Sequence, residues 1–249
     1  MSSFYTAVAH DLQLLHPPRL AAIEFLAQLA GPPPARVVDV AAGSGGYAAL
    51  LQHRGFQTYA IEVNAELCTV IRERHPDLAG VIHGDMLEVF DLVRGPVALA
   101  NCIGGSLGEL GSLGEVADVI GQLLDLCGPQ GTVVLDVPNF DHLRAQREQV
   151  GAEWRCELAP ISAYREDGSE LRLEQHYAWL ADGTLLLRRR FSAPEGEVFD
   201  EQPLLELGRD TLAGCIPADV SAEWYGDWHA AAWCRVSGQT IAVLKRVKS

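Results

Sequence analysis

The chain lacks several features that would place it in a special class of protein. Its six cysteines (68, 102, 127, 156, 215 and 234) are scattered, with no Cys-x-x-Cys pair or histidine-rich spacing. This argues against a disulfide framework and a zinc site. No apolar run reaches the roughly 18–20 residues of a membrane span. The opening "MSSFYTAVAHDLQLLHPPRL" lacks the basic start and cleavage site of a signal peptide. We therefore expect a cytoplasmic protein with no membrane partner and no metal.

Basic residues are scarce as well. The chain has 19 Lys and Arg against 33 Asp and Glu, for a formal net charge of −14. A surface this acidic repels phosphate backbones, and the densest basic run is only "LRRRF" (187–191). We expect no nucleic-acid partner, and the field mildly favours cationic small molecules. Solubility alone explains the charge equally well.

Apolar strands and amphipathic helices alternate through the first 150 residues. Residues 5–30 read as two helices divided by "HPPR". The strands expected after them are 36–41, 57–62, 80–85, 96–102 and 131–137, with helices at 45–54, 64–75 and about 112–126. Near-continuous apolar strands that alternate with helices predict a parallel sheet covered on both faces. Right-handed crossovers make it a doubly wound, Rossmann-like α/β layer.

Beyond residue 150 the pattern becomes that of antiparallel β structure. "SELRLEQHYAWLADGTLLLRRRFS" (169–192) predicts a hairpin around "ADG", and with residues 153–164 a sheet of about three strands. Residues 201–215 read as a helix, and 219–228 with 238–247 as a closing strand pair. We therefore predict a Rossmann-like core with an N-terminal helical cap (1–150 and 194–249) and a β insertion (151–193) that forms a substrate lid.

The stretch "VVDVAAGSGGYAAL" (37–50) joins the first strand to its helix through glycines. Such a turn lets a ligand approach the backbone at the sheet edge where ligands bind. The spacing "GSGGYA" fits G-x-G-x-x-A, and Glu62 ends the next strand, so the pattern alone also fits a dinucleotide site. Asp39 inside the strand would crowd a pyrophosphate, whereas it suits a cationic ligand.

These residues resemble a known family. "VVDVAAGSG" is similar to the first motif of class I S-adenosylmethionine-dependent methyltransferases of the small-molecule type, glycine-N-methyltransferase-like or methyltransferase-domain 25-like, with Ala41 where that family often has glycine. "HGDM" (83–86), "ANCIGGSLGEL" (100–110), "YGDW" (225–228) and "FYTAVAHDLQLLHP" extend the resemblance over nearly the whole chain.

The resemblance implies a seven-stranded sheet whose last strand is antiparallel, and S-adenosylmethionine as the cofactor, with S-adenosylhomocysteine as its product. It also implies that a set of residues contacts the cofactor, Glu62 through the ribose and Asp85 with Met86 through the adenine. That set is Tyr5, Asp39, Ala41, Gly43, Gly45, Glu62, Val63, Asp85, Met86, Asn101 and Cys102.

The chain departs from the family pattern on the substrate side. Gly105, Glu109 and His10 stand where the pattern has Asn, His and Tyr, so the amino-acid acceptors of the family are not carried over. The signature [DN]-P-P-[YF] of enzymes that methylate adenine or glutamine amides is absent. The resemblance then implies methyl transfer to the nitrogen or oxygen of a small molecule, by a monomer or a homodimer.

The residues that we expect to orient the acceptor or to act as a base are Asn101, Ser106, Tyr177 and His142. His176 and Tyr177 alternate along one strand, so at most one of them faces the pocket. Asp227 and His229 are further candidates, although His229 is better explained as a loop residue. Trp154 and Trp179 read as core, and Arg188–Arg190 as a solvated face, unless one arginine holds a substrate carboxylate.

Two other functions stay open on the sequence. The first is an NAD(P)-dependent oxidoreductase, because of the G-x-G-x-x-A spacing and Glu62. The second is a cofactor-binding, methyltransferase-like protein with a non-methylating activity, because the segment around Gly105 and Glu109 is altered.

Overall fold

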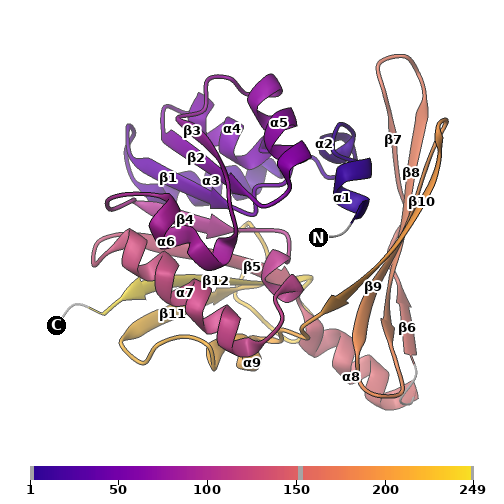
Figure 1. Cartoon of the computed structure of the whole chain (residues 1–249). Coiled ribbons are helices and arrows are strands. Elements are labelled where there is room, and N and C mark those ends of the chain that lie inside the picture. The colour runs from indigo at the N-terminus through magenta and orange to yellow at the C-terminus, as the bar shows by residue number, and fades with distance from the viewer. Residues whose placement is uncertain (1–2, 151–153, 248–249) are drawn as a thin grey trace.

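A seven-stranded sheet forms the centre of the computed structural model, which describes residues 3–150 and 154–247. Its strand order is β11-β12-β5-β4-β1-β2-β3 (Figure 1). The strands are β1 (Arg36–Val40), β2 (Gln57–Glu62), β3 (Gly80–His83), β4 (Leu99–Cys102), β5 (Thr132–Pro138), β11 (Val220–Tyr225) and β12 (Gln239–Arg246). β12 pairs antiparallel with both β5 and β11, whereas β3, β2, β1, β4 and β5 pair in parallel. The predicted Rossmann-like fold with an antiparallel last strand is confirmed.

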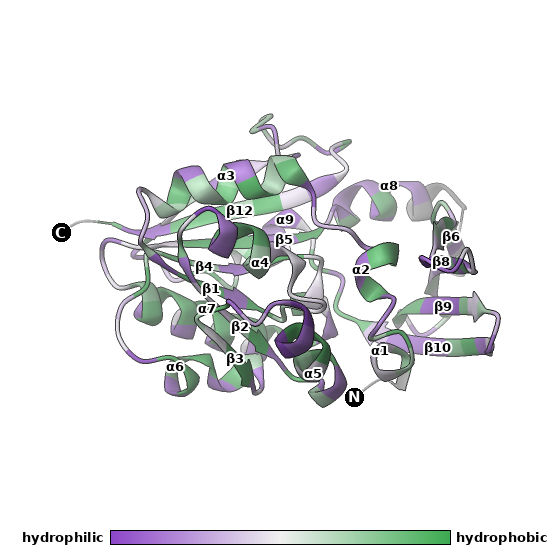
Figure 2. Ribbon diagram, turned by 90° about the horizontal axis from the view of Figure 1, so that it is seen from above, coloured by the Kyte–Doolittle hydropathy of each residue, from purple (hydrophilic) through white to green (hydrophobic). Residues whose placement is uncertain are grey.

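Helices cover both faces of this sheet, as the apolar strands require. Along β1, Val38 and Val40 pack in the cluster that contains α7, whereas Val37 packs in the cluster that contains α3. Figure 2 shows α3 and α7 on opposite sides of the sheet. The helices of the core are α3 (Leu20–Ala30), α4 (Gly46–His53), α5 (Ala65–Arg74), α6 (Val89–Leu92), α7 (Leu113–Cys127) and α9 (Arg209–Ala213), with 3-10 turns η1 (Met86–Glu88) and η2 (Ser106–Glu109).

A second, antiparallel sheet stands beside the carboxyl ends of the core strands (Figure 1). Its strands are β6 (Trp154–Glu157), β7 (Ile161–Tyr164), β8 (Glu170–Trp179), β9 (Leu185–Ala193) and β10 (Gly196–Leu204). They are ordered β10-β9-β8-β6, and β7 also pairs with β8. The helix α8 (Phe140–Val150) leads from β5 into this sheet.

The second sheet is larger than the sequence predicts. The predicted strand 153–164 breaks around Pro160 into β6 and β7, because proline cannot donate to a strand ladder. Residues 201–204 were predicted to be helical but belong to β10, which pairs with β9 and carries the sheet to Leu204. The helical prediction followed a short apolar run, and long-range pairing overrides such local preference. Only Arg209–Ala213 of 201–215 is helical.

The N-terminal segment bridges the two sheets. It forms α1 (Ser3–Ala7) and α2 (Leu12–Leu15) ahead of α3, where the sequence predicted two helices in all. Arg165, beyond β7, donates to both carboxylate oxygens of Asp11 at 2.9 and 2.8 Å. The Asn64 side chain, on the core, donates to Thr6 Oγ1 at 3.0 Å. No helix in the described part of the chain has the length and apolar character needed to cross a membrane.

The turn between β1 and α4 depends on glycine at position 45. Gly45 precedes the helix with φ +75°, a conformation that residues with a Cβ rarely adopt. A Cβ at this position would lie 2.9 Å from Cγ2 of the buried Ile71 on α5. The tight packing of this turn on α5 therefore requires glycine.

We expect Gly45→Ala to lower the free energy of unfolding by about 2–4 kcal/mol, because backbone strain and the clash with Ile71 add. Urea denaturation measures the change. Gly183→Ala is the control, because Gly183 has φ +88° with open space around it, and it should lose only the roughly 1–2 kcal/mol of strain. Equal losses in the two variants would contradict the packing argument.

Candidate active site

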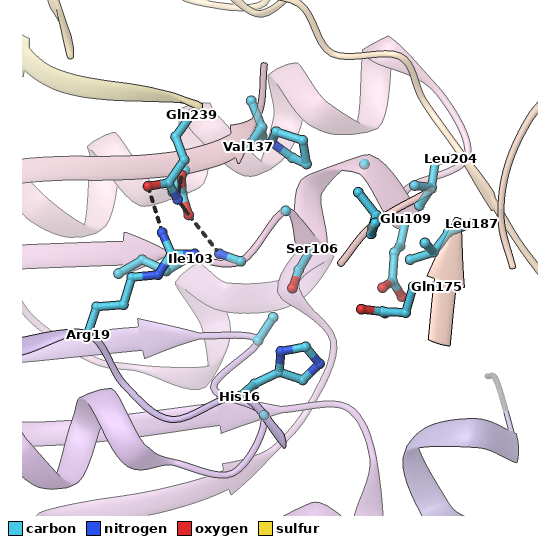
Figure 3. Close-up of a pocket in the computed structure, with 18 of the residues that line it drawn as sticks. His16, Arg19, Ile103, Ser106, Glu109, Val137, Gln175, Leu187, Leu204 and Gln239 are labelled. Carbon is cyan, nitrogen blue, oxygen red and sulfur yellow. Dashed lines mark hydrogen bonds between the residues drawn. The ribbon is translucent and has the colours of Figure 1, made fainter. Parts of the chain in front are cut away.

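A cavity of about 970 Å³ lies at the carboxyl ends of β1, β4 and β5 and reaches the second sheet. The core contributes Asp39, Ala41, Gly43 and the loop after β4 to its wall. The N-terminal segment contributes Tyr5 and His16–Arg19, and the second sheet closes the far side (Figure 3). Ligands of open α/β sheets bind at this edge, so the cavity is the candidate site.

Asp39 is a buried carboxylate with one unpaired oxygen. Its side chain accepts a hydrogen bond from Asn101 Nδ2 at 2.5 Å, since the two residues are direct neighbours on β1 and β4. Its second oxygen, Oδ2, is buried and has no partner among the described residues. Burial, only partly offset by the Asn101 hydrogen bond and by the nearby backbone N–H of Ala48, raises the pKa of Asp39 to about 7. A charged carboxylate held this way calls for a donor or a cation from a ligand.

The glycine turn above Asp39 is held by Glu62. The two oxygens of this carboxylate accept from the backbone N–H of Gly43 at 2.8 Å and of Asn64 at 2.9 Å. Burial raises the pKa of Glu62. Ala41 has φ +55°, a left-handed conformation that glycine adopts more readily than alanine. The end of β2 thereby fixes the loop that follows β1.

Asp136, at the end of β5, is a second buried acid in the cavity wall. Its carboxylate accepts from Gln239 Nε2 at 3.0 and 3.1 Å and from the Gly104 N–H at 3.3 Å. Gln239 Oε1 in turn accepts from Arg19 at 2.7 Å (Figure 3). Burial raises the pKa of Asp136 to about 6. This chain of contacts fixes the loop after β4.

A hydrogen-bonded series closes the opposite side of the cavity. The Tyr5 hydroxyl donates to Glu109 Oε1 at 2.8 Å and accepts from Arg189 Nη1 at 3.1 Å. Arg189 also pairs with Asp200 at 2.5 Å, and both side chains are buried. Burial and the nearby Glu109 raise the pKa of Tyr5 well above its usual range, so the phenol keeps its proton. We call Tyr5, Glu109, Arg189 and Asp200 the Tyr5 network.

The structure brings many of the predicted site residues to this one cavity. Those that line it are Tyr5, Asp39, Ala41, Gly43, Ser106, His142 and Tyr177. Others lie directly behind the wall, where Glu62 holds Gly43, Asn101 holds Asp39, and Gly45 packs on α5. Cys102 is fully buried in the core, and burial raises the pKa of its thiol.

Val63, Asp85 and Met86 do not line this cavity. Asp85 is exposed and accepts from the Leu87 N–H at 3.0 Å, which caps η1. Met86 packs on the core, and the Val63 carbonyl contacts the His83 ring at 3.0 Å. All three follow β2 or β3, at the same sheet edge as the cavity, so their cofactor contacts stay predictions.

The predicted catalytic residues differ in how they face the cavity. Tyr177 packs edge-on against Phe140, and burial raises its pKa to about 12. His142 lines the cavity from α8 and contacts the Gln146 side chain at 2.9 Å. His176 borders a different hollow on the outer face of the second sheet, as the alternation along the strand requires. Asn101 contacts Asp39 and is a positioning residue in this geometry.

The other candidates from the sequence lie elsewhere. Asp227 caps its own loop by accepting from the His229 and Ala231 N–H groups, and neither Asp227 nor His229 lines the cavity. Trp154 and Trp179 stack on each other at 5.0 Å between ring centroids, as expected of core residues.

Arg189 and Asp136 are site residues that the sequence prediction missed. The sequence predicted a solvated face for Arg189, but it shares the apolar face of β9 with Leu187 and Phe191 and lies opposite Asp200 of β10. Asp136 interrupts an apolar strand just as Asp39 does, so the same signal was present in "VVLDVP". Within residues 3–150 and 154–247, no group of His, Cys, Asp or Glu is arranged to hold a metal ion.

Comparison with known proteins places this site in context. A model of a methyltransferase domain family matches residues 10–185. The dTDP-3-amino-3,6-dideoxy-alpha-D-glucopyranose N,N-dimethyltransferase of Streptomyces fradiae is 27% identical over 152 residues, which make up 59% of this chain and 57% of that protein. The match therefore spans little more than half of the curated relative.

Solved structures resemble nearly the whole chain. DesVI of Streptomyces venezuelae has a TM-score of 0.73 at 18% identity, with 97% of this chain and 98% of DesVI covered. An S-adenosylmethionine-dependent methyltransferase of Clostridium acetobutylicum has a TM-score of 0.75 at 12% identity, with 98% and 100% covered. At these identities the likeness establishes the fold.

The unpaired oxygen of Asp39 predicts a pH-dependent loss of stability. With a pKa of about 7 in the folded chain against 3.8 in the unfolded chain, Asp39 keeps its proton longer when folded. The stability that the protonated Asp39 contributes to the folded chain is therefore fully present below about pH 4. It is lost as the pH rises through 7. We expect Asp39→Asn, which mimics the protonated acid, to be more stable than the parent at pH 8 by about 2–4 kcal/mol.

Chemical denaturation of both proteins between pH 5 and pH 8, without ligand, measures this difference. The exposed Asp118→Asn is the control and should match the parent at every pH. A constant difference between the parent and Asp39→Asn over this range would refute the assignment of a buried, shifted carboxylate.

Proposed function

The chain belongs to the methyltransferase domain family, and we propose that it transfers the methyl group of S-adenosylmethionine to the nitrogen of a small-molecule amine. Because the chain belongs to this family, methyl transfer is favoured over the oxidoreductase alternative. The observation that carries the proposal is the buried, unpaired Asp39 Oδ2 beneath a glycine turn at the ligand-binding edge of the sheet. The relative from Streptomyces fradiae is named as an N,N-dimethyltransferase, which supports nitrogen as the acceptor atom.

The residues present fit the cofactor, S-adenosylmethionine. Asp39 offers a carboxylate oxygen that nothing described in the chain satisfies, and the cofactor brings positive charge and donors. The left-handed turn at Ala41, Gly43 and Gly45 keeps the backbone open to a ligand. A carboxylate at this position would disfavour the diphosphate of a dinucleotide, so the acid discriminates between the two ligand classes.

We assign the remaining contacts by position along the sheet edge. Glu62 already holds two N–H groups, and its remaining lone pairs would accept from ribose hydroxyls. Asp85 and Met86, past the end of β3, would contact the adenine, with Val63 beside them. Tyr5 and Ser106 line the side of the cavity nearer the second sheet, where the acceptor would meet the cofactor.

When bound, S-adenosylmethionine supplies a methyl group on a positively charged sulfur that leaves as a neutral thioether. The chain therefore needs to align the acceptor nitrogen with that carbon and exclude water. As the nitrogen bonds to carbon, it gains the positive charge that the sulfur loses. Carboxylates that face the cavity stabilise charge developing at that atom. Before it can attack, an acceptor ammonium must lose one proton, which passes to water or to a basic side chain.

The second sheet would act as the lid over the acceptor in this proposal. Together with α8 it closes the side of the cavity that the core leaves open, and it contributes Gln175, Tyr177 and Leu187 to the wall. A partly apolar cavity of this size suits a small molecule rather than a nucleic acid. The proposed division is a core with an N-terminal cap and a lid of β6–β10.

Calorimetry with S-adenosylhomocysteine tests the cofactor site directly. We expect micromolar binding by the parent chain and at least about tenfold weaker binding by Asp39→Ala, the scale of one lost charge-assisted hydrogen bond. The surface variant Asp118→Asn should bind as the parent does.

Mass spectrometry of reactions with S-adenosylmethionine then tests the acceptor class. Each amine is offered beside its alcohol isostere, and methylated amine with equal S-adenosylhomocysteine release is expected. No binding of S-adenosylhomocysteine at millimolar concentration, or methylation of the alcohols alone, would refute the proposal.

A further inference from the structure

The Tyr5 network leaves one negative charge without a countercharge, and it lies on Glu109. Asp200 and Glu109 are acids and Arg189 is the only base in the network. Arg189 gives its Nε and Nη2 donors to Asp200, stacks on the Phe4 ring at 4.3 Å, and is buried. Glu109 makes no ion pair with any residue that the structure describes, and its only described hydrogen bond comes from Tyr5. The free charge therefore faces the cavity.

Glu109 is held in place and still has room for a ligand. The Tyr5 hydroxyl occupies Oε1, which leaves Oε2 and further lone pairs open. Glu109, Ser106 and Gln175 present their polar ends to the same space in Figure 3. An amine with two or three N–H groups matches this set of acceptors, whereas an alcohol offers one donor.

The wall beside Glu109 is apolar. Phe140, Leu158, Leu187 and Leu204 line the cavity on the side of the second sheet, together with the ring of Tyr177. A substrate body placed there gains by burying hydrocarbon.

Few basic groups in the described wall are available to a phosphate. Arg189 is neutralised by Asp200 and also donates to Tyr5. Arg19 lies across the cavity, where it donates to Gln239 (Figure 3). Burial and the charges of Arg189 and Arg19 lower the pKa of His16, which leaves it neutral at pH 7. His142 is the remaining basic side chain among the described residues that line the cavity. The far side of the cavity thus repels a nucleoside diphosphate more than it attracts one.

We propose that Glu109 anchors the nitrogen of the acceptor, and that the acceptor is an amine with an apolar body rather than a nucleotide-linked amino sugar. Glu109 is thus the residue that selects nitrogen over oxygen. This inference rests on the proposed function, since it names the substrate class of the same site.

The test measures binding to the full chain saturated with S-adenosylhomocysteine at pH 7.5. The probes are 2-phenylethylamine, its neutral isostere 2-phenylethanol, and a dTDP-linked 3-amino sugar. We expect the parent chain to bind 2-phenylethylamine at least tenfold more tightly than either of the others. Glu109→Gln should lose that preference, since it removes the charge and keeps the size. The exposed Glu73→Gln is the matched control and should keep it.

The outcomes separate this inference from the proposed function. If the parent chain binds S-adenosylhomocysteine but fails to prefer the amine to the alcohol, or fails to prefer it to the sugar nucleotide, the inference is wrong and the methyltransferase proposal stands. If Glu109→Gln binds S-adenosylhomocysteine normally and retains the amine preference, Glu109 is not the anchor. Loss of S-adenosylhomocysteine binding in Glu109→Gln also overturns the inference, because it makes the residue part of the fold or the cofactor site. The comparison of probes on the parent chain tests the substrate class by itself, whereas the variant tests the role of Glu109.

Discussion

The site depends on a single unfavourable arrangement, the burial of the Asp39 carboxylate with one oxygen unpaired. Such a group costs several kcal/mol in an apolar interior unless a partner arrives. The neighbouring strand β4 satisfies one of its two oxygens, through Asn101. The turn that follows β1 contains Gly43 and Gly45, both with positive φ, and Gly43 lines the same cavity as the acid. An asparagine at position 39 would stabilise the fold more than the acid does at neutral pH. We therefore attribute the acid to ligand binding.

The cavity exists only because two separate sheets meet across the N-terminal segment. The core offers acids at the ends of its strands, which suits a cationic cofactor, and the second sheet offers hydrocarbon and the Arg189–Asp200 pair. Tyr5 connects them, with one hydrogen bond to each side. Because Arg189 is neutralised by Asp200, it serves as a rigid support for Tyr5 and adds no positive charge to the cavity. The core side of the cavity is thus acidic, whereas the side formed by the second sheet is mostly apolar.

Local patterns predicted the core well because they encode it directly. Near-continuous burial along β1 is typical of a parallel strand covered on both faces, and the glycines after it favour an open turn. The second sheet was underestimated because its edge strand β10 carries a proline and few apolar residues. β10 is a strand because it pairs with β9, and no short window of sequence shows that pairing. Arg189 was misjudged for the same reason, since its partner Asp200 lies on that strand.

The sequence by itself determined the core fold, the glycine turn at the edge of the cavity and the acids Asp39 and Glu62, because each follows from residues close together in the chain. Only the tertiary structure decided which side chains share the cavity. In the Tyr5 network, Glu109 lies 104 residues from Tyr5 in the chain, and Arg189 lies 184 residues from it. Their contact depends on how the second sheet packs against the N-terminal segment. The sign of the charge that they present to a substrate is therefore a property of packing, which the order of residues alone does not display.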